Sequence, residues 1–428
     1  MKPTKKIYWH TTVQMPEVSP LPPLPEKVDV AIIGGGFTGL SAARTLAGQG
    51  VRVAVLEANS IGWGASSRNG GMVLTGLKIG MQSVMKKYGQ ELANRLFQCS
   101  LESIDTVEQI VREENIDCGF SRYGHLLAAN KPKHYESLQE EVEFMERHFN
   151  HKTRLVPREQ QTTEIGSNRY YGGLLDECSG GLNPAQYVTG LARAAENAGA
   201  SLQARARVIE IRRGGSRFLL ETERGSLSAE SVLIATSGYT GRVTRTLQRK
   251  IIPIGSFIIA TEKLADVLVR ELIPRGRMIF DFKHYLNYFR LWDNRMIFGG
   301  RAAFFPETSR TVQRSAEILR REMIEVYPQL KDAKIEYVWG GTLDFAFDRM
   351  THVGATEGMY YSLGYAGHGV AMATYLGKTV ANAMLKGNIK EHPFASFPFP
   401  GAPLGLYNGF PWFLPLAGVW HKILDWIE

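Results

Sequence analysis

Short apolar runs and one helix-spaced segment open the chain, and they predict a strand–helix–strand unit. Val30–Ile33 is a continuous apolar run, typical of a strand that is buried on both faces. Leu40–Leu46 has apolar residues at helical spacing, and Val51–Leu56, apolar except for Arg52, is the second predicted strand. A complete βαβ unit in about thirty residues is typical of a dinucleotide-binding domain.

A glycine-rich turn joins the first strand to the helix. It has G-x-G-x-x-G spacing, which permits a tight turn, close backbone approach to a pyrophosphate and close packing of helix on strand. The helix N-terminus adds a positive dipole end. The candidate phosphate-binding residues are therefore Gly34, Gly36, Phe37, Thr38 and Gly39.

An acidic residue, Glu57, ends the second strand and is followed by Ala58. Its carboxylate can accept hydrogen bonds from both hydroxyls of an adenosine ribose, and its charge repels a 2′-phosphate. The alternative is a purely structural glycine turn. Strand, helix, second strand and terminal acid are in register, which favours the dinucleotide site.

The segment that follows distinguishes FAD from NAD. It is rich in Gly and Ser and carries one arginine, so its backbone and hydroxyls can approach phosphate oxygens and the arginine can add charge. A flexible surface loop is the alternative, although Trp63 and Met72 are poor linker residues. The candidate residues here are Gly64, Ala65, Ser66, Ser67, Arg68, Asn69, Gly70 and Gly71.

These motifs resemble the FAD-dependent D-amino-acid oxidase superfamily and, within it, the branch of gamma-glutamylputrescine oxidoreductases. Three later segments share the resemblance: 207–211, 232–239 and 359–371. The resemblance implies that adenine meets Val208, that the pyrophosphate lies near Thr236, Ser237 and Gly238, and that a turn passes under the flavin. The residues of that turn and its helix are Gly364, Gly367, His368, Gly369 and Val370.

The FAD motifs are separated by segments of other character. Residues 81–158 read mostly as helices, 251–340 alternate like strands with a hairpin turn at Asp293-Asn294, and Thr311–Tyr327 has helical spacing. We expect an α/β fold: a Rossmann-like FAD-binding domain with an inserted substrate domain on a mixed, largely antiparallel sheet. The expected parts are an extended arm (1–27), the FAD-binding domain (28–80, 159–247 and 345–390), the substrate domain (81–158 and 248–344) and a tail helix (391–428).

Composition and charge argue against nucleic-acid binding, disulfides and a metal site. The chain has 428 residues, 44% of them hydrophobic, and a net charge of +8 that is spread along its length. The densest basic stretch, Arg242–Lys250, has no nucleic-acid motif, so we interpret it as a solvated face rather than an anion-binding patch. Three cysteines without C-x-x-C spacing predict no disulfide and no metal site, and indicate a reducing, cytoplasmic setting: Cys99, Cys118 and Cys178.

The two termini are distinctive. Lys2, Lys5 and Lys6 are not followed by an apolar segment, so no signal peptide is expected. Pro20–Pro25 is a stiff lead-in, and Tyr8-Trp9 before it is expected to wrap the surface. No apolar run reaches about 18 residues. At the C-terminus, Pro398–Glu428 is apolar near helical spacing from Leu416, which favours a packed helix over an interfacial membrane anchor, because its polar face has few cations.

In this superfamily the flavin performs the redox chemistry, and the protein orients a neutral amine over it. The candidate catalytic residues are Tyr288, His368 and Asp344. Tyr288 lies on a strand that in relatives places a tyrosine above the flavin, with a possible one-residue shift to Asn287 or Phe289; sheet packing is the alternative. His368 can bond the flavin, take up the amine proton, or only bond backbone.

Trp339 and Asp344 lie on a segment that in relatives runs beside the flavin. Asp344 either attracts a cationic amine or caps a turn. Leu343 stands near the position where D-amino-acid oxidases carry an arginine that clamps the substrate carboxylate. Leucine cannot form this clamp and nothing in the sequence shows that Arg290 or Arg301 replaces it, which favours amines over alpha-amino acids as substrates.

Two further departures from relatives concern the flavin. No cysteine occurs in 339–342, where some sarcosine oxidases link FAD covalently, so non-covalent FAD is expected. Ile297 stands in place of a lysine that those enzymes use for oxygen activation, which argues against efficient reaction with oxygen and leaves oxygen, a quinone or another acceptor open.

The expected function is FAD-dependent oxidation of a small-molecule amine, similar to gamma-glutamylputrescine, by hydride transfer to flavin N5 and imine hydrolysis to an aldehyde. Oxidation of D- or N-substituted amino acids is the alternative within enzymes. A non-catalytic subunit stabilised by FAD is the alternative of another class.

Overall fold

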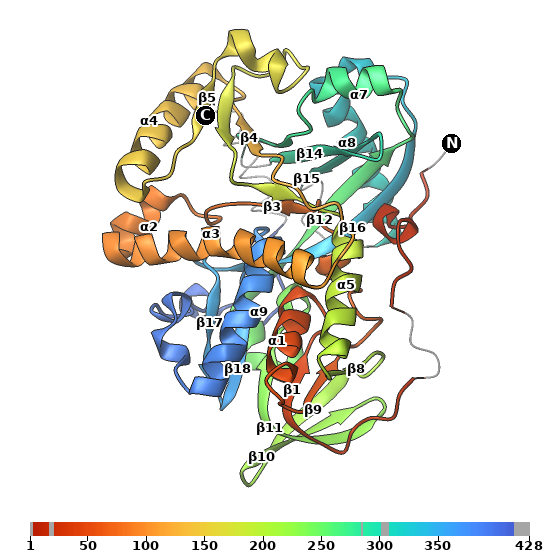
Figure 1. Ribbon diagram of the computed structural model, residues 1–428, viewed down its shortest axis with the longest axis vertical. Helices are drawn as coiled ribbons and strands as arrows, with labels where there is room; N and C mark the ends of the chain where they lie inside the picture. The colour runs from red at the N-terminus through yellow and green to blue at the C-terminus, as the bar shows by residue number, and fades with distance from the viewer. Residues whose placement is uncertain (1–2, 17–20, 284–285, 301–307, 415–428) are drawn as a thin grey trace.

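The computed structural model describes residues 3–16, 21–283, 286–300 and 308–414. Two eight-stranded sheets form the two halves of the molecule, one in the lower part of Figure 1 and one in the upper part. This α/β architecture, with one Rossmann-like half and one mixed sheet, confirms the predicted fold class.

The lower sheet has the order β17-β18-β11-β1-β2-β8. Strand β1 pairs in parallel with both β2 and β11, as the βαβ pattern predicted. A hairpin, β9-β10, extends from β11. The strands are β1 (Lys27–Ile33), β2 (Val53–Leu56), β8 (Ser201–Gln203), β9 (Val208–Gly214), β10 (Arg217–Thr222), β11 (Gly225–Ile234), β17 (His352–Thr356) and β18 (Met359–Leu363).

Strand β1 is apolar without alternation because its two faces enter two different cores. Val30 and Ile32 pack with the helices on one face, and Ala31 and Ile33 pack in a separate cluster on the other. Figure 1 shows the helices that cover the first face side by side. They are α1 (Phe37–Ala47), α5 (Pro184–Asn197) and α9 (Gly369–Lys386), with α3 (Gln90–Glu113) across α9.

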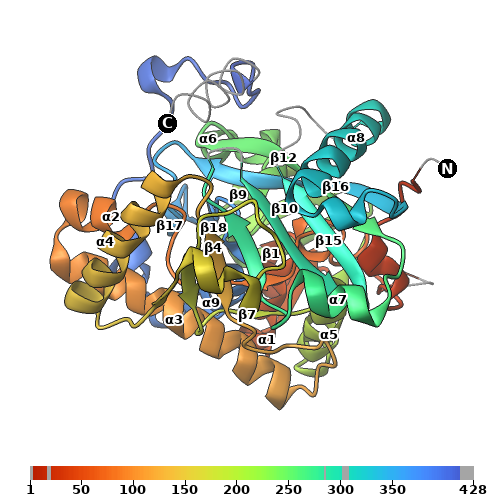
Figure 2. The same ribbon diagram turned by 90° about the horizontal axis from the view of Figure 1, so that it is seen from above.

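The upper sheet has the order β16-β12-β15-β14-β13-β4-β6-β5 and is largely antiparallel, with one parallel pair, β4 and β13. Helix α8 (Ser309–Val326) packs against its outer face, as Figure 2 shows from above. The strands are β4 (His125–Ala128), β5 (Arg154–Val156), β6 (Gly173–Asp176), β12 (Ile251–Thr261), β13 (Met278–Asp281), β14 (Asn287–Trp292), β15 (Arg295–Gly300) and β16 (Ile335–Ala346).

Successive side chains of these strands point to opposite faces of the upper sheet, one toward α8 and the other toward the FAD-binding half. Phe257 and Phe289 are buried beneath α8, whereas Ser256 and Tyr288 face the FAD-binding half. The predicted hairpin at Asp293-Asn294 is confirmed: both residues have positive φ, 48° and 58°, which a type I′ turn requires.

The remaining described elements connect or flank the two sheets. They are α2 (Met81–Tyr88), α4 (Pro132–Phe149), α6 (Arg245–Gln248), α7 (Asp266–Leu272), and the short pair β3 (Met72–Val73) and β7 (Gly180–Gly181).

Two segments lie elsewhere than the expected domain boundaries placed them. Strand β6 falls within 159–247, expected in the FAD-binding domain, but it pairs with β4 of the upper sheet. Helix α3 falls within 81–158, expected in the substrate domain, but it packs on α9 in the core of the lower half. The periodicity of a segment predicts whether it forms a helix or a strand, but not which element it packs against. The placement of β6 and α3 therefore follows only from the strand pairing and burial in the structure.

The N-terminal arm enters the protein rather than wrapping its surface. A short 3-10 helix, Tyr8–Thr11, places Trp9 at 0% exposure between the two halves. Within 391–414 the expected tail helix is replaced by short 3-10 turns and irregular chain; the part from Leu416 lies outside the described residues. No helix in the described ranges has both the length and the apolar character needed to span a bilayer.

Candidate active site

A cavity of about 650 Å³ opens at the carboxyl ends of β1 and β2, where open α/β sheets bind their ligands. The N-terminus of α1 points into it. Gly34 has φ +111°, and a Cβ there would come within 2.5 Å of the carbonyl oxygen of Ala235. A Cβ on Gly36 would lie 2.7 Å from the Ser66 Oγ, so a larger residue there would have to displace the Ser66 side chain.

Hydrogen bonds join the Gly/Ser-rich loop and the start of α1 at this end of the cavity. The backbone N–H of Phe37 donates to the Ser66 Oγ at 2.9 Å. The Thr38 hydroxyl bonds the Tyr365 hydroxyl at 2.7 Å, which ties the phosphate turn to the segment before α9. The remaining N–H groups of the first helical turn are suited to an anionic ligand.

Glu57 lies at the end of β2 with both carboxylate oxygens engaged. Oε2 accepts from the backbone N–H of Gly35 at 2.8 Å, and Oε1 accepts from that of Asn59 at 2.9 Å. These bonds hold the carboxylate at the rim of the cavity, which Glu57 also lines. Each oxygen keeps a lone pair for a ribose hydroxyl.

We expect Glu57→Gln to weaken FAD binding by about 1.5–3 kcal/mol, roughly tenfold to a hundredfold in Kd, because an amide offers only one acceptor to two backbone donors. Titration of the apoprotein with FAD, followed by flavin fluorescence, measures the change. Glu91→Gln, on the exposed face of α3, is the matched control. Equal affinity in both variants would show that Glu57 is not the ribose ligand.

Most of the predicted FAD-binding residues line the large cavity. They are Gly34, Gly36, Phe37, Thr38, Glu57, Ala58, Gly64, Ala65, Ser66, Asn69, Val208, Thr236, Ser237, Gly367, Gly369 and Val370. Six others line neither this cavity nor the smaller one described below, and support the walls instead: Gly39, Ser67, Gly71, Gly238, Trp339 and Gly364.

The supporting residues act through packing and hydrogen bonds. A Cβ on Gly39 would overlap the carbonyl oxygen of Gly34, so this glycine permits the turn to close on the helix. The Ser67 Oγ bonds His10 of the N-terminal arm at 2.8 Å. Trp339 is buried and donates from Nε1 to the carbonyl oxygen of Arg68 at 2.9 Å. Motif matching selects such residues together with true ligands because both lie in the same turns.

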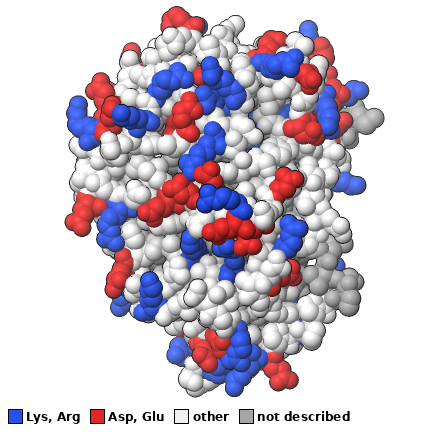
Figure 3. All heavy atoms as spheres, viewed as in Figure 1, with Lys and Arg blue, Asp and Glu red and all other residues white. Residues whose placement is uncertain are grey.

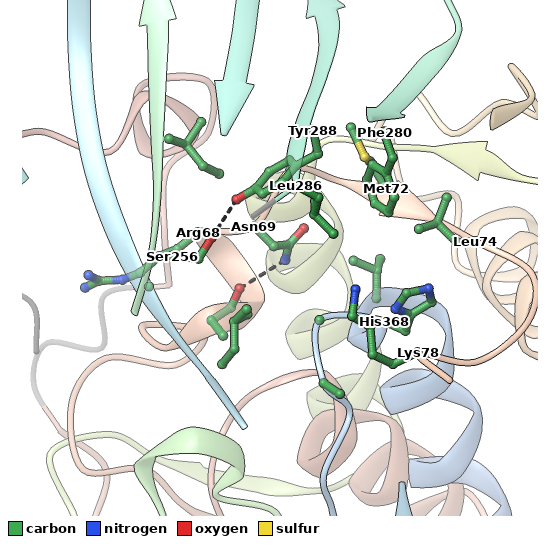
Figure 4. A pocket seen from close by; sticks show the side chains of 18 of the residues that line it. Arg68, Asn69, Met72, Leu74, Lys78, Ser256, Phe280, Leu286, Tyr288 and His368 are labelled. Atoms are coloured by element: carbon green, nitrogen blue, oxygen red, sulfur yellow. Dashed lines mark hydrogen bonds between the residues drawn. The ribbon is translucent and has the colours of Figure 1, made fainter. Parts of the chain in front are cut away.

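Arg68 does not lie in the large cavity, contrary to the expected phosphate role. Its Nε donates to the Trp63 carbonyl oxygen at 2.8 Å, and its guanidinium stacks 4.3 Å from the Trp63 ring centre. Figure 4 shows the guanidinium directed away from the middle of the smaller cavity. Arg68 therefore holds the Gly/Ser-rich loop to the backbone of Trp63 just before it. The guanidinium also donates to the carbonyl oxygen of Gly340 in β16.

The structure adds cavity residues that the motifs did not single out. Trp63 and Tyr239 form an edge-to-face aromatic pair with ring centres 5.5 Å apart, and both line the large cavity. Arg207 and Arg242 supply its cationic side chains. Arg242 belongs to the basic stretch expected to be a solvated face; it is exposed and also lines this cavity.

A smaller cavity of about 100 Å³ adjoins the large one, and Figure 4 shows it from close by. The two share the wall residues Ala65, Asn69, Leu343, Gly367 and Val370. Its other walls are mainly apolar side chains from both halves of the protein, as substrate pockets usually are. They include Met72, Leu74, Ile258, Phe280, Leu286 and Phe345.

Tyr288 is held on the wall of the smaller cavity. Its hydroxyl lies 3.0 Å from the Ser256 Oγ. Glycines at positions 70 and 299 make room for its ring, because a Cβ on Gly299 would overlap it. The register therefore places Tyr288 at the cavity, while Phe289 points to the core and Asn287 is buried beside it.

His368 lies in the turn before α9, next to Lys78, as Figure 4 shows. Its Nδ1 is buried and has no hydrogen-bond partner among the described residues. Burial, and secondarily the charge of Lys78, lowers the His368 pKa to about 3, so the ring is neutral at physiological pH. A neutral ring is a hydrogen-bond partner rather than a store for a proton.

Asp344 lines the large cavity and not the smaller one, so its position does not support attraction of a substrate amine. Its Oδ2 accepts from the Gly364 N–H at 2.7 Å, which caps the turn leading to His368. Burial raises the Asp344 pKa to about 6. Of the two roles the sequence left open, the geometry favours the turn cap.

Comparison with known proteins identifies the family of this chain. Residues 29–383 match the family described as "FAD dependent oxidoreductase" (DAO). The chain is 33% identical to the probable oxidoreductase OrdL of Haemophilus influenzae over 85% of each chain. It is also 33% identical to gamma-glutamylputrescine oxidoreductase of Escherichia coli, over 87% of this chain and 88% of the relative.

Among solved structures, glycine oxidase of Geobacillus kaustophilus shares the fold, with a TM-score of 0.73 and 21% identity over 89% of this chain and all of that one. The family match and the two relatives thus define an FAD-dependent oxidoreductase. The chain belongs to the DAO family of FAD-dependent oxidoreductases, as the sequence motifs predicted.

Proposed function

We propose that this protein oxidises an amine that also carries a carboxylate, of the gamma-glutamylputrescine kind, to an aldehyde by way of an imine. The observation that carries this proposal is the charge of the smaller cavity. Its described lining includes the cations Lys78 and Arg68 and the neutral ring of His368, but no Asp or Glu. Such a cavity favours a substrate with a neutral amine and a carboxylate. This interpretation takes the place of the earlier hypothesis that the Asp344 carboxylate attracts a cationic amine.

The large cavity fits FAD. The helix N-terminus, Glu57 and the aromatic pair of Trp63 and Tyr239 lie along one continuous space, as phosphates, ribose and rings require. When bound, FAD supplies the hydride acceptor, flavin N5. The protein binds the substrate, excludes water with its apolar walls, and offers Tyr288 and His368 to the amine.

The cofactor is proposed to be non-covalent, because none of the described residues lining either cavity is a cysteine. Acid precipitation that leaves flavin in the pellet would contradict this.

Oxygen or a quinone is proposed as the electron acceptor. Ile297, at the position of the oxygen-activating lysine of relatives, is buried among Trp9, Ile258 and Trp339. A cytoplasmic location is proposed on the three unpaired cysteines.

The substrate class is tested by anaerobic flavin reduction with a panel of amines. We expect gamma-glutamylputrescine to reduce the flavin faster than putrescine, which lacks a carboxylate, and faster than D-alanine, D-proline or sarcosine. Faster reduction by the amino acids would instead support an amino-acid oxidase or dehydrogenase. Reduction by none of them would exclude this substrate class.

Lys78→Gln separates the carboxylate contact from the chemistry. A charge-assisted bond is worth about 1.5–3 kcal/mol, so we expect roughly tenfold or greater loss of affinity for gamma-glutamylputrescine and no change for putrescine. Lys133→Gln, on the exposed start of α4, is the control. An equal loss for both substrates would show that Lys78 does not bind the carboxylate.

A further inference from the structure

The described end of the chain carries a concentrated apolar surface. Eight large apolar side chains are exposed among the described residues, and three of them fall within seven positions. They are Leu406, Phe410 and Trp412, with exposed fractions of 68%, 65% and 57%. Single exposed apolar residues are ordinary, but a cluster with two aromatic rings marks a contact surface.

The segment that carries these side chains is anchored to the protein body. Tyr407 is buried and donates from its hydroxyl to the Ile251 carbonyl oxygen at 2.8 Å. Leu414 is buried with Ile252, Ile254 and Phe345. The anchors and the exposed side chains alternate along one short stretch, so the chain presents the apolar groups outward from a fixed position.

Cations lie beside this segment. A Cβ on Gly409 would lie 2.6 Å from the Gln248 side chain, so residues 407–409 abut helix α6. Arg245 of this helix and Arg249, which directly follows it, are exposed. Figure 2 shows the blue C-terminal chain next to α6 on one side of the molecule. The nearest acid that the bonds identify is Glu357, which accepts from Thr246 at 2.7 Å.

We propose that Leu406, Phe410 and Trp412, flanked by Arg245 and Arg249, form a peripheral contact surface for an anionic lipid bilayer. Aromatic side chains enter the headgroup region, and arginines beside them pair with lipid phosphates. On the face seen in Figure 3, by contrast, acidic and basic side chains are interspersed. Leu414 also packs in one cluster with Phe345 and Ala366, which line the smaller cavity, so the bilayer would lie close to the active site.

Vesicle sedimentation with the full-length, FAD-loaded protein tests this surface. We expect binding to vesicles that contain phosphatidylglycerol and much weaker binding to pure phosphatidylcholine, reduced by salt. Arg245→Gln with Arg249→Gln should lower the partition coefficient about fivefold per arginine. Phe410→Ser with Trp412→Ser should lower it about tenfold or more.

Val267→Ser with Arg270→Gln, an equally exposed pair on α7, is the matched control and should bind as the wild type does. All variants keep residues 415–428, so only the surface differs, and their flavin content and Tm verify folding. Absence of binding to either vesicle, or unchanged binding in both double variants, would overturn the proposal. Conversion of a dimer to a monomer by Phe410→Ser with Trp412→Ser would overturn it in favour of an interface between copies.

Discussion

Tyr288→Phe and His368→Gln are each expected to slow anaerobic flavin reduction by about a hundredfold while FAD stays bound, the usual value of a positioned acid–base or hydrogen-bonding group. Both side chains line the smaller cavity, and the Tyr288 ring is fixed by Ser256 and two glycines. Stopped-flow absorbance of the flavin with gamma-glutamylputrescine measures the rate.

Tyr360→Phe and His148→Gln are matched controls, because neither residue lines the large cavity or the smaller one beside it. A change under about threefold in both site variants would show that neither group assists the reaction.

The pH profile distinguishes two roles for His368. Its pKa is lowered to about 3, so it stays neutral from there upward and contributes no ionisation between pH 6 and 10. The rise of the reduction rate with pH should therefore follow deprotonation of the substrate amine and keep its midpoint in His368→Gln. A midpoint that disappears in this variant would show that His368 itself takes up the proton.

Trp9→Ala is expected to have the largest effect on stability, about 3–5 kcal/mol for loss of a fully buried indole. Trp9 lies edge-on to Trp292 and Trp339, with ring centres 5.8 and 6.4 Å away. Its Nε1 donates to the Asn69 carbonyl oxygen at 2.9 Å. Since Asn69 lines both cavities, FAD affinity should fall as well.

Thermal unfolding at fixed FAD concentration and FAD titration measure the two effects. Trp9→Phe keeps most of the packing and loses only the indole bond, so we expect it to cost about 0.5–1.5 kcal/mol. Wild-type Tm and FAD affinity in Trp9→Ala would show that the arm is not part of the site.

The local pattern of the chain determined the FAD half. A βαβ unit needs only about thirty contiguous residues, and its turn requires glycine at positions 34 and 39, where a Cβ would meet backbone atoms; the spacing of these glycines is visible in the sequence. Likewise, Asp293-Asn294 predicted its hairpin because positive φ is a local property. In both the glycine turn and the hairpin, the residues that determine the backbone conformation lie within a few positions of it.

Only the tertiary structure decided the contacts made between distant segments. It turned Arg68 toward Trp63 and away from the large cavity, made Asp344 a turn cap, and brought Lys78 next to His368, 290 positions along the chain. It also buried Trp9, which sequence position alone placed on the surface. Residue type and spacing do not specify which side chains meet across two sheets, because pairing and packing depend on the whole chain.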